Sequence, residues 1–262
     1  MRDLIKEFIE IFLHERAGLG GAAYEELVFN AIKAAGASGN MTHTAGFDAN
    51  LPDADITDNG EVYNVEVKMD GGAQMGGGSI GWDSGEFFVA GKDVDAMQPI
   101  VDTLNSSHDL EEMSAAIQNF VDFLNKHRRK IGKEVSGFPM AGVSKEAWDL
   151  AVDQRLLVPI NRKVDSSVDF IAGHYAHKGT HYIQIGGQGL FYLSSNPANL
   201  PIPKLKGRVQ LEIRAVRGGS GGRPTVNAGL RVQPRLKITS ESPYTLDDPK
   251  SVRAMLRAAK GH

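Results

Sequence analysis

The chain has 262 residues, of which 41% are hydrophobic and 23% charged, the composition of a soluble globular protein able to bury a core. It contains no cysteine, which excludes disulfides, thiolate zinc sites and cysteine nucleophiles. Its amphipathic start carries acids, unlike a signal peptide, and no apolar run is long enough to predict a transmembrane helix. We therefore expect a cytoplasmic protein with no membrane partner.

The net charge of −3 hides an uneven distribution. Residues 201–262 hold thirteen Lys and Arg against four Asp and Glu, whereas the first 200 residues are acidic overall. Because basic surface neutralises phosphates and acidic residues hold divalent cations, this division favours a nucleic-acid partner. A dipolar surface without a partner is the alternative.

Two helices are expected at the start of the chain, over 1–16 and about 22–35. In the second, apolar residues follow Glu25 at offsets of three, four and seven. These offsets place the four side chains on one helical face. The three apolar residues are Val28, Phe29 and Ile32.

Residues 51–68 are expected to form a β-hairpin around Asn59-Gly60, because a type I′ turn needs φ > 0 at both central residues. If these two residues form the loop, Asp53 lies opposite Glu66, with Cβ atoms about 4.5–5.5 Å apart, close enough to hold one metal ion. Like charges directly opposed destabilise a sheet, so this pair favours a bound cation. The side chains expected on the same face are Asp53, Asp55, Asn64, Glu66 and Lys68.

Pro52-Asp53, followed by Glu66-Val67-Lys68 after a hydrophobic strand, resembles the PD-(D/E)XK nuclease superfamily. The resemblance implies a restriction-endonuclease-like core, with a mixed sheet flanked by helices. It also implies that the acidic pair and the peptide carbonyl between Glu and Lys bind Mg²⁺, for which Mn²⁺ would substitute. The lysine would orient or activate the attacking water.

Carried over to this chain, the resemblance makes Glu66 and the Val67 carbonyl metal ligands, with either Asp53 or Asp55 as the second acid. Asp53 fits the Pro-Asp dipeptide and the cross-strand geometry. Asp55 fits the family variant in which the acid directly precedes a buried hydrophobic residue. Glu25 corresponds to the glutamate that the family places on a preceding helix, and would be a further ligand of the metal or the water.

The glycine-rich stretch 71–85 is expected to be a flexible loop before a strand at 86–90. It lacks the ending of a P-loop and the glycine spacing of a Rossmann fold, so nucleotide binding is not expected. Gln74 within it resembles the glutamine that some PD-(D/E)XK relatives aim at DNA or water. Residues 93–160 are expected to be mostly helical. The helices predicted there span 95–104 and 109–127.

From about residue 165 we expect short strands, closed by a helix at 249–260. One strand alternates polar and apolar residues, and Arg and Gln on its polar face are suited to reading base edges in the major groove. This predicts contact with DNA, the alternative being a solvated sheet face. The predicted strands are 170–172, 180–185, 190–193, 209–216 and 230–238. The predicted DNA-contacting residues, besides Gln74, are Arg208, Gln210, Arg214, Arg217, Arg223, Arg231 and Arg235.

The expected fold class is α/β (α+β), with a nuclease core and helical insertion over 1–164 and a β-rich, DNA-contacting region over 165–262. The expected function is that of a Mg²⁺-dependent endonuclease that hydrolyses phosphodiester bonds in double-stranded DNA, of restriction or homing type. Alternatives are a Holliday-junction resolvase or other structure-specific nuclease, and a nucleic-acid-binding protein with an inactive nuclease core. A zinc hydrolase using His174, His177 and His181 is a further alternative. Because a double-strand cut needs two active sites, a homodimer is also expected.

Overall fold

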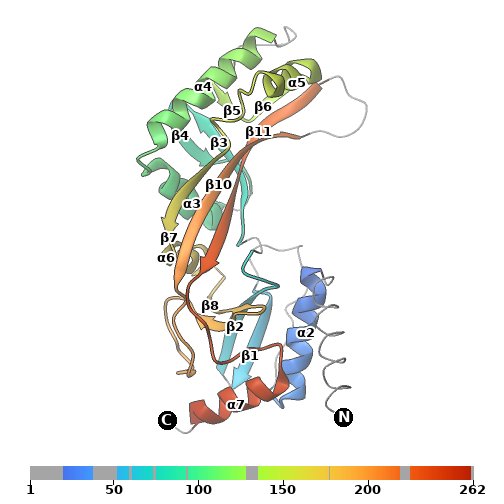
Figure 1. Ribbon diagram of the computed structural model, residues 1–262, viewed down its shortest axis with the longest axis vertical. Helices are drawn as coiled ribbons and strands as arrows, with labels where there is room; N and C mark the ends of the chain where they lie inside the picture. The colour runs from blue at the N-terminus through green and yellow to red at the C-terminus, as the bar shows by residue number, and fades with distance from the viewer. Residues whose placement is uncertain are drawn as a thin grey trace. The chain divides into compact units, whose positions relative to one another are not determined.

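The computed structural model describes residues 20–37, 52–58, 61–72, 75–92, 94–127, 135–176, 178–218 and 225–260. Within these ranges the chain forms six helices and eleven strands, arranged in two sheets, which confirms the expected mixed α/β class (Figure 1). No helix among the described residues has the length and apolar character needed to cross a membrane. The helix expected at 1–16 lies outside these ranges.

The chain divides into two compact units, each assembled from separated segments. These bounds differ from the expected division at 164/165, because strands from the two expected regions pair with each other. Strand β10 (Gly207–Gly218) pairs with β7 (Arg162–Ser167), and β11 (Thr225–Ile238) pairs with β3 (Gly78–Asp83), both antiparallel. Unit 1 comprises Met1–Ala73, Tyr175–Gly207 and Ile238–His262, and unit 2 comprises Gln74–His174 and Arg208–Lys237.

Unit 1 contains a four-stranded mixed sheet in the order β1-β2-β8-β9. Its first pair is an antiparallel hairpin, β2 and β8 are parallel, and β8 and β9 are antiparallel. A parallel pair requires a crossover connection, and the chain returns to β8 directly after helix α6 (Asp169–Ala176). The four strands are β1 (Ala54–Asp58), β2 (Glu61–Lys68), β8 (Thr180–Ile185) and β9 (Gly189–Tyr192).

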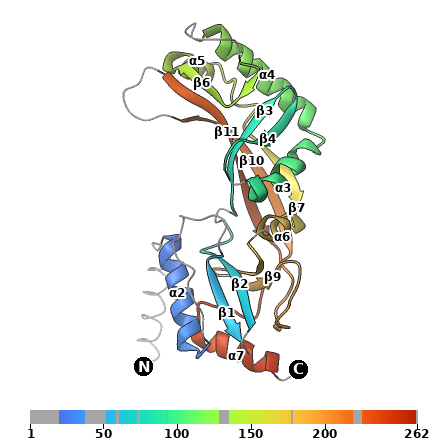
Figure 2. The same cartoon turned by 180° about the vertical axis from the view of Figure 1, so that it is seen from behind.

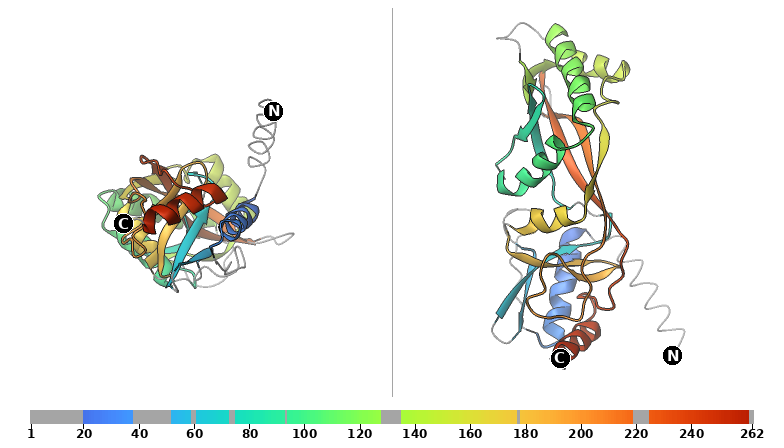
Figure 3. Two further views of the ribbon diagram at one scale, coloured as in Figure 1. Left: turned by 90° about the horizontal axis from the view of Figure 1, so that it is seen from below. Right: turned by 90° about the vertical axis from the view of Figure 1, so that its left-hand side faces the viewer.

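Helices α2 (Gly21–Ala34) and α7 (Pro249–Lys260) pack on one face of this sheet and contact each other, as Figures 2 and 3 show. The core between them contains Val65 and Val67 of β2 and Tyr182 of β8, all almost fully buried. Alternation along β2 therefore turns Glu66 and Lys68 toward the opposite face. Both helices lie where the sequence predicts them.

Unit 2 contains a seven-stranded sheet with the main order β4-β3-β11-β10-β7, to which β5 and β6 are added through β3 and β11. Helices α3, α4 and α5 contact strands of this sheet. One hydrogen bond between the layers runs from Trp82 Nε1 of β3 to Ser114 Oγ of α4, at 3.2 Å. The remaining elements are β4 (Glu86–Val89), β5 (Gly137–Phe138), β6 (Met140–Ser144), α3 (Val94–Asn105), α4 (Leu110–His127) and α5 (Lys145–Asp153).

Part of the glycine-rich stretch 71–85, expected to be a loop, is strand β3. Ile80 and Trp82, two positions apart and therefore on one face of the strand, are both buried. Gly81 is needed for packing, since a Cβ there would stand 2.1 Å from the ring of Phe88 on the paired strand. The prediction of a flexible loop was wrong for this segment.

The strand predicted at 170–172 was also wrong, because these residues belong to helix α6. Ile171, His174 and Tyr175 are all buried, at the offsets of three and four that a helix places on one face. Within the expected helical region, residues 137–144 instead form β5 and β6, which pair with β3 and β11.

Candidate functional site

The hairpin has the register predicted from the sequence. Asp58 pairs with Glu61 and Ala54 with Val65, with no shift between them. The Asn59-Gly60 turn itself lies outside the described residues, but the register on either side fits a two-residue loop. By alternation, Asp55, Asn64 and Glu66 therefore share one face, and the predicted pair of Asp53 with Glu66 lies just beyond the last observed pair.

Asp53 directly precedes β1 and interacts with the strand that carries the other motif residues. Its Oδ2 atom accepts a hydrogen bond from the backbone amide of Val67 at 2.8 Å. The same oxygen lies 3.6 Å from Lys68 Nζ. By contrast, Asp55 is buried opposite Asn64 on β2. The structure thus brings Asp53, rather than Asp55, next to Lys68.

Glu66 is the centre of the cluster, with only 2% of its surface exposed. Lys68 Nζ donates to its Oε1 at 2.5 Å, and Lys178 Nζ donates to its Oε2 at 3.1 Å. Lys178 precedes β8, and the parallel pairing of β2 with β8 brings the two residues together. Each carboxylate oxygen of Glu66 therefore has an ammonium partner.

Glu25 is half-buried on α2 and belongs to the same electrostatic cluster. Burial raises the pKa of Glu25 to about 7, with a further increase from the charges of Asp53 and Glu66, partly opposed by Lys68 and Lys178. The buried face of α2 is centred on Tyr24 and Val28, so Glu25 lies at its flank and not at its centre as predicted. That position leaves the carboxyl at the margin between core and solvent.

The cluster combines three carboxyl groups with two ammonium groups. Burial raises the pKa of Asp53, and the charge of Glu66 adds to that increase despite Lys68. Burial acts in the same direction on Glu66, but Lys68 and Lys178 together hold its pKa below the usual value. Although burial disfavours its charge, Lys68 has a raised pKa because Tyr175, Glu66 and Asp53 favour the ammonium form. A cation would relieve the repulsion among the carboxylates.

The available donors suit Mg²⁺, since they are three carboxylates and the backbone carbonyl of Val67, and Mg²⁺ prefers oxygen ligands. As they stand, no three His, Asp or Glu side chains within the described ranges form a group able to hold a metal ion. Lys68 and Lys178 each pair with one oxygen of Glu66. A metal bound to that carboxylate would repel these ammonium groups.

Sequence reasoning did not assign Lys178 and Tyr175 to this cluster. The Tyr175 ring centre lies 5.9 Å from Lys68 Nζ and 5.3 Å from Lys178 Nζ, within the range of cation–π attraction. Both residues lie more than 100 positions beyond the hairpin in the chain. Only the parallel pairing of β2 with β8 identifies them, and no local pattern encodes that pairing.

The predicted DNA-contacting residues belong to the sheet of unit 2. Side chains of β10 and β11 alternate between buried and more exposed positions, as predicted. Arg208 and Arg231 are exposed and form no ion pair with another described residue, whereas Gln210 Nε2 donates to Asp165 Oδ1 at 2.9 Å. Gln74 and Arg223 lie outside the described residues.

A buried glutamate, Glu212, lies among the basic side chains of this sheet face. It pairs with Lys163 at 3.3 Å, Arg214 at 3.1 Å and Arg235 at 3.3 Å. Burial opposes its charge, but the hydrogen bonds from Lys163 and Arg235 hold the pKa of Glu212 below the usual value. Arg217 instead pairs with Asp149 of α5 at 2.9 Å. Glu212 and Asp149 therefore neutralise part of the positive charge of these basic side chains.

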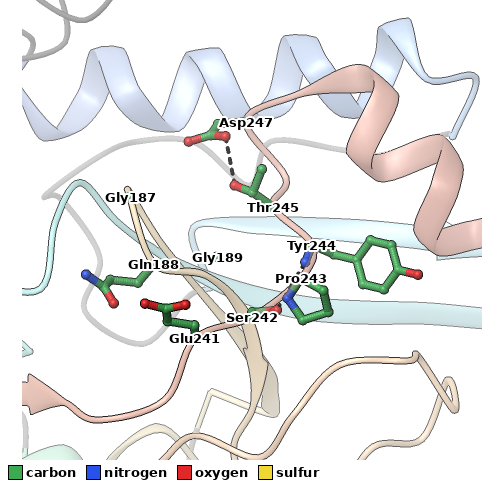
Figure 4. A pocket seen from close by; sticks show the side chains of 9 residues that line it. All are labelled: Gly187, Gln188, Gly189, Glu241, Ser242, Pro243, Tyr244, Thr245 and Asp247. Carbon is green, nitrogen blue, oxygen red and sulfur yellow. Dashed lines mark hydrogen bonds between the residues drawn. The ribbon is translucent and has the colours of Figure 1, made fainter.

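Unit 1 also has a pocket of about 400 Å³, which shares no residue with the carboxylate cluster (Figure 4). Its Asp247 accepts hydrogen bonds from the hydroxyls of Tyr24 and Thr245, both at 2.7 Å. This carboxylate thus takes part in a structural network that holds α2 against the segment before α7. The lining residues are Gly187, Gln188, Gly189, Glu241, Ser242, Pro243, Tyr244, Thr245 and Asp247.

Among the described residues, the histidines do not form part of a group that could hold a metal ion. His174 lies in α6 with its Nδ1 2.7 Å from the carbonyl of Ala96, His181 lies in β8, and His177 is outside the described residues.

Comparisons with protein-family models, with curated proteins and with solved structures find no match to this chain.

Proposed function

We propose that this protein is a metal-dependent DNA endonuclease whose active site is the carboxylate and lysine cluster of unit 1. The main support is that Asp53, Glu66 and Lys68 form one largely buried group of paired charges, and that Glu25 of α2 lies close enough for its pKa to respond to those charges. Burying several carboxylates near one another is costly and adds little to stability. Such an arrangement is typical of a site kept for chemistry.

The proposed fold of unit 1 is a restriction-endonuclease-like core. Its mixed sheet, the preceding helix that carries Glu25 and the hairpin with the acidic motif agree with that expectation. Unit 2 would then be formed by two insertions into this core rather than by a separate C-terminal region. These insertions provide the surface for substrate binding in this proposal.

In the proposed reaction, Mg²⁺ held by Asp53, Glu66 and the Val67 carbonyl, with Glu25 as an added ligand, would polarise the phosphoryl oxygen and lower the pKa of a bound water. Lys68 would supply positive charge where the transition state accumulates negative charge. Since its pKa is raised, Lys68 acts as an ammonium and a hydrogen-bond donor, not as the base that takes the proton of water.

Double-stranded DNA is the proposed substrate, because the basic face of unit 2 suits a polyanion. Its exposed arginines provide phosphate contacts, and Gln210 provides an amide able to read a base edge. A sequence-recognising enzyme of restriction or homing type is favoured over a junction resolvase. A resolvase would need little beyond the core, and unit 2 is a large addition to it.

The test is nicking of supercoiled plasmid DNA by the wild-type protein and by Glu66→Gln and Lys68→Ala, with Mg²⁺, Mn²⁺ or EDTA. We expect cleavage with either metal by the wild type, none in EDTA, and a loss of at least about a hundredfold in both variants. Glu61→Gln is the matched control, because Glu61 is an exposed carboxylate on the same strand. Equal nicking by wild type and Glu66→Gln would exclude this site as the source of activity.

A further inference from the structure

Lys178 is a partly buried lysine that the PD-(D/E)XK motif does not include. Its side chain is only 10% exposed, and its ammonium lies 3.1 Å from Glu66 Oε2. Long flexible lysines are almost never buried without a specific partner. Its position at the centre of the candidate active site therefore needs an explanation.

The turn that carries Lys178 is fixed from both sides. Asn64 Nδ2 on β2 lies 3.3 Å from the carbonyls of both Lys178 and Gly179, to which it donates. The amide of Lys178 donates to the carbonyl of Tyr175 at 3.1 Å, and Gly179 has a φ of +60°, which favours glycine. Asn64, on the same face as Glu66, thus holds the turn that delivers Lys178.

Neutralisation of Glu66 alone does not account for this second ammonium. Lys68 already pairs with Glu66 and also approaches Asp53. Each oxygen of Glu66 already has one ammonium beside it, so a divalent cation bound to this carboxylate would stand close to both ammonium groups and repel them. When a cation takes Glu66, one ammonium must find another anion, and the scissile phosphate is the anion that a nuclease brings to this site.

We propose that Lys178 is a catalytic residue that exchanges Glu66 for a non-bridging oxygen of the scissile phosphate when metal and DNA bind. This inference rests on the proposed nuclease function. In the free protein the ion pair keeps Lys178 in place, and in the complex the same ammonium binds the phosphate beside the metal. The charge of the phosphodiester then replaces the charge of the carboxylate, so Lys178 keeps an anionic partner throughout.

The first test compares single-turnover nicking by Lys178→Gln and Lys178→Arg over a series of Mg²⁺ concentrations. We expect Lys178→Gln to lower the rate at saturating Mg²⁺ by about a hundredfold, as for loss of one charge-stabilising donor, and Lys178→Arg to recover part of it. Lys250→Gln on α7 is the control, being an exposed lysine of the same unit. If Lys178 only blocks Glu66, the Gln variant will cleave at least as fast as wild type and need less Mg²⁺, which overturns the proposal.

A second readout needs no cleavage. In a Glu66→Gln background, adding Lys178→Gln should weaken duplex binding, measured by fluorescence anisotropy, and reduce the salt slope by about one unit. Unchanged affinity and slope would overturn the phosphate contact whatever the nicking result. Failure of the proposed function is distinct, because wild type would then show no Mg²⁺-dependent nicking at all. Melting temperatures of each variant establish that it is folded, and Lys178→Arg preserves the charge if Lys178→Gln does not fold.

Discussion

The Oδ2 atom of Asp53 accepts a hydrogen bond from the backbone amide of Val67 at 2.8 Å. Asp53 thus uses its side chain to join the strand that carries Glu66 and Lys68. Asp55 instead lies opposite Asn64, two positions further along the hairpin. The two acids that the motif leaves as alternatives therefore have different positions, and Asp53 contacts both the strand backbone and Lys68.

Asp53→Asn should separate the charge of this residue from its structural hydrogen bond. The amide oxygen still accepts from Val67, so the free energy of unfolding should change little, while plasmid nicking should fall by at least about a hundredfold. Asp55→Asn should lower nicking by no more than about tenfold, as for a residue outside the immediate site. The opposite ranking of the two variants would show that Asp55 is the ligand.

Asp53→Ala should destabilise the fold as well, because it leaves the buried amide of Val67 without its acceptor. The expected cost is about 1–3 kcal/mol in urea unfolding. A stability equal to that of Asp53→Asn would show that this hydrogen bond does not hold the start of β1.

The raised pKa of Glu25, about 7, predicts a pH-dependent stability of the metal-free protein. A carboxyl whose pKa is raised on folding contributes stability below its unfolded-state pKa, near 4.5, and loses it as the pH rises through about 7. Glu25→Gln lacks this loss. In EDTA, Glu25→Gln should have the same melting temperature as the wild type at pH 4.5 and a higher melting temperature at pH 8.

Thermal unfolding at several pH values measures this difference. Glu26→Gln, an exposed neighbour on α2, is the control and should follow the wild type at every pH. The idea fails if the gap between Glu25→Gln and wild type is the same at pH 4.5 and pH 8. Added Mg²⁺ at pH 8 should stabilise the wild type more than Glu25→Gln, because a cation offsets the carboxylate repulsion.

Tyr24→Phe should destabilise unit 1 by about 1–3 kcal/mol, the cost of leaving buried hydrogen-bonding partners unsatisfied. The Tyr24 hydroxyl donates to Asp247 Oδ2 at 2.7 Å and accepts from Gln184 Nε2 at 3.1 Å, joining α2 to β8 and to the segment before α7. Urea unfolding followed by circular dichroism measures the change. Tyr192→Phe, at a partly exposed tyrosine of β9, should stay within about 0.5 kcal/mol of wild type.

Arg231→Ala should weaken duplex binding across sequences and lower the salt slope by about one unit, because an exposed arginine contributes mainly phosphate neutralisation. Glu212→Gln should have the reverse effect, since it removes the carboxylate that pairs with three basic side chains of the same face. Anisotropy titrations at several salt concentrations measure both. Identical slopes for the two variants and wild type would place the DNA surface elsewhere.

The hairpin shows what local sequence can predict. A two-residue loop fixes the register, and period-two alternation then fixes the face of each side chain. The observed pairing agrees from Asp58 to Ala54. Helices α2 and α7 were also predicted, since amphipathic spacing and helix boundaries are local signals.

The errors occur where long-range contacts override local composition. Strand β3 lies in a glycine-rich stretch, and its glycines make room for neighbours such as the Phe88 ring. The segment 170–172 has the apolar content of a strand. The buried residues Ile171, His174 and Tyr175, however, have the spacing that a helix places on one face. Burial patterns of this kind are visible only once the partners are known.

The sequence by itself determined the mixed α/β class, the hairpin register and the set of acidic residues with one lysine on a single face, because turn chemistry and side-chain periodicity act over a few residues. The tertiary structure decided which of these residues meet. It placed Asp53 rather than Asp55 beside Lys68, brought Lys178 to Glu66 across 112 positions, and gathered three basic side chains around Glu212. Such contacts depend on parallel pairing and on joint burial, which connect distant segments and leave no local signal.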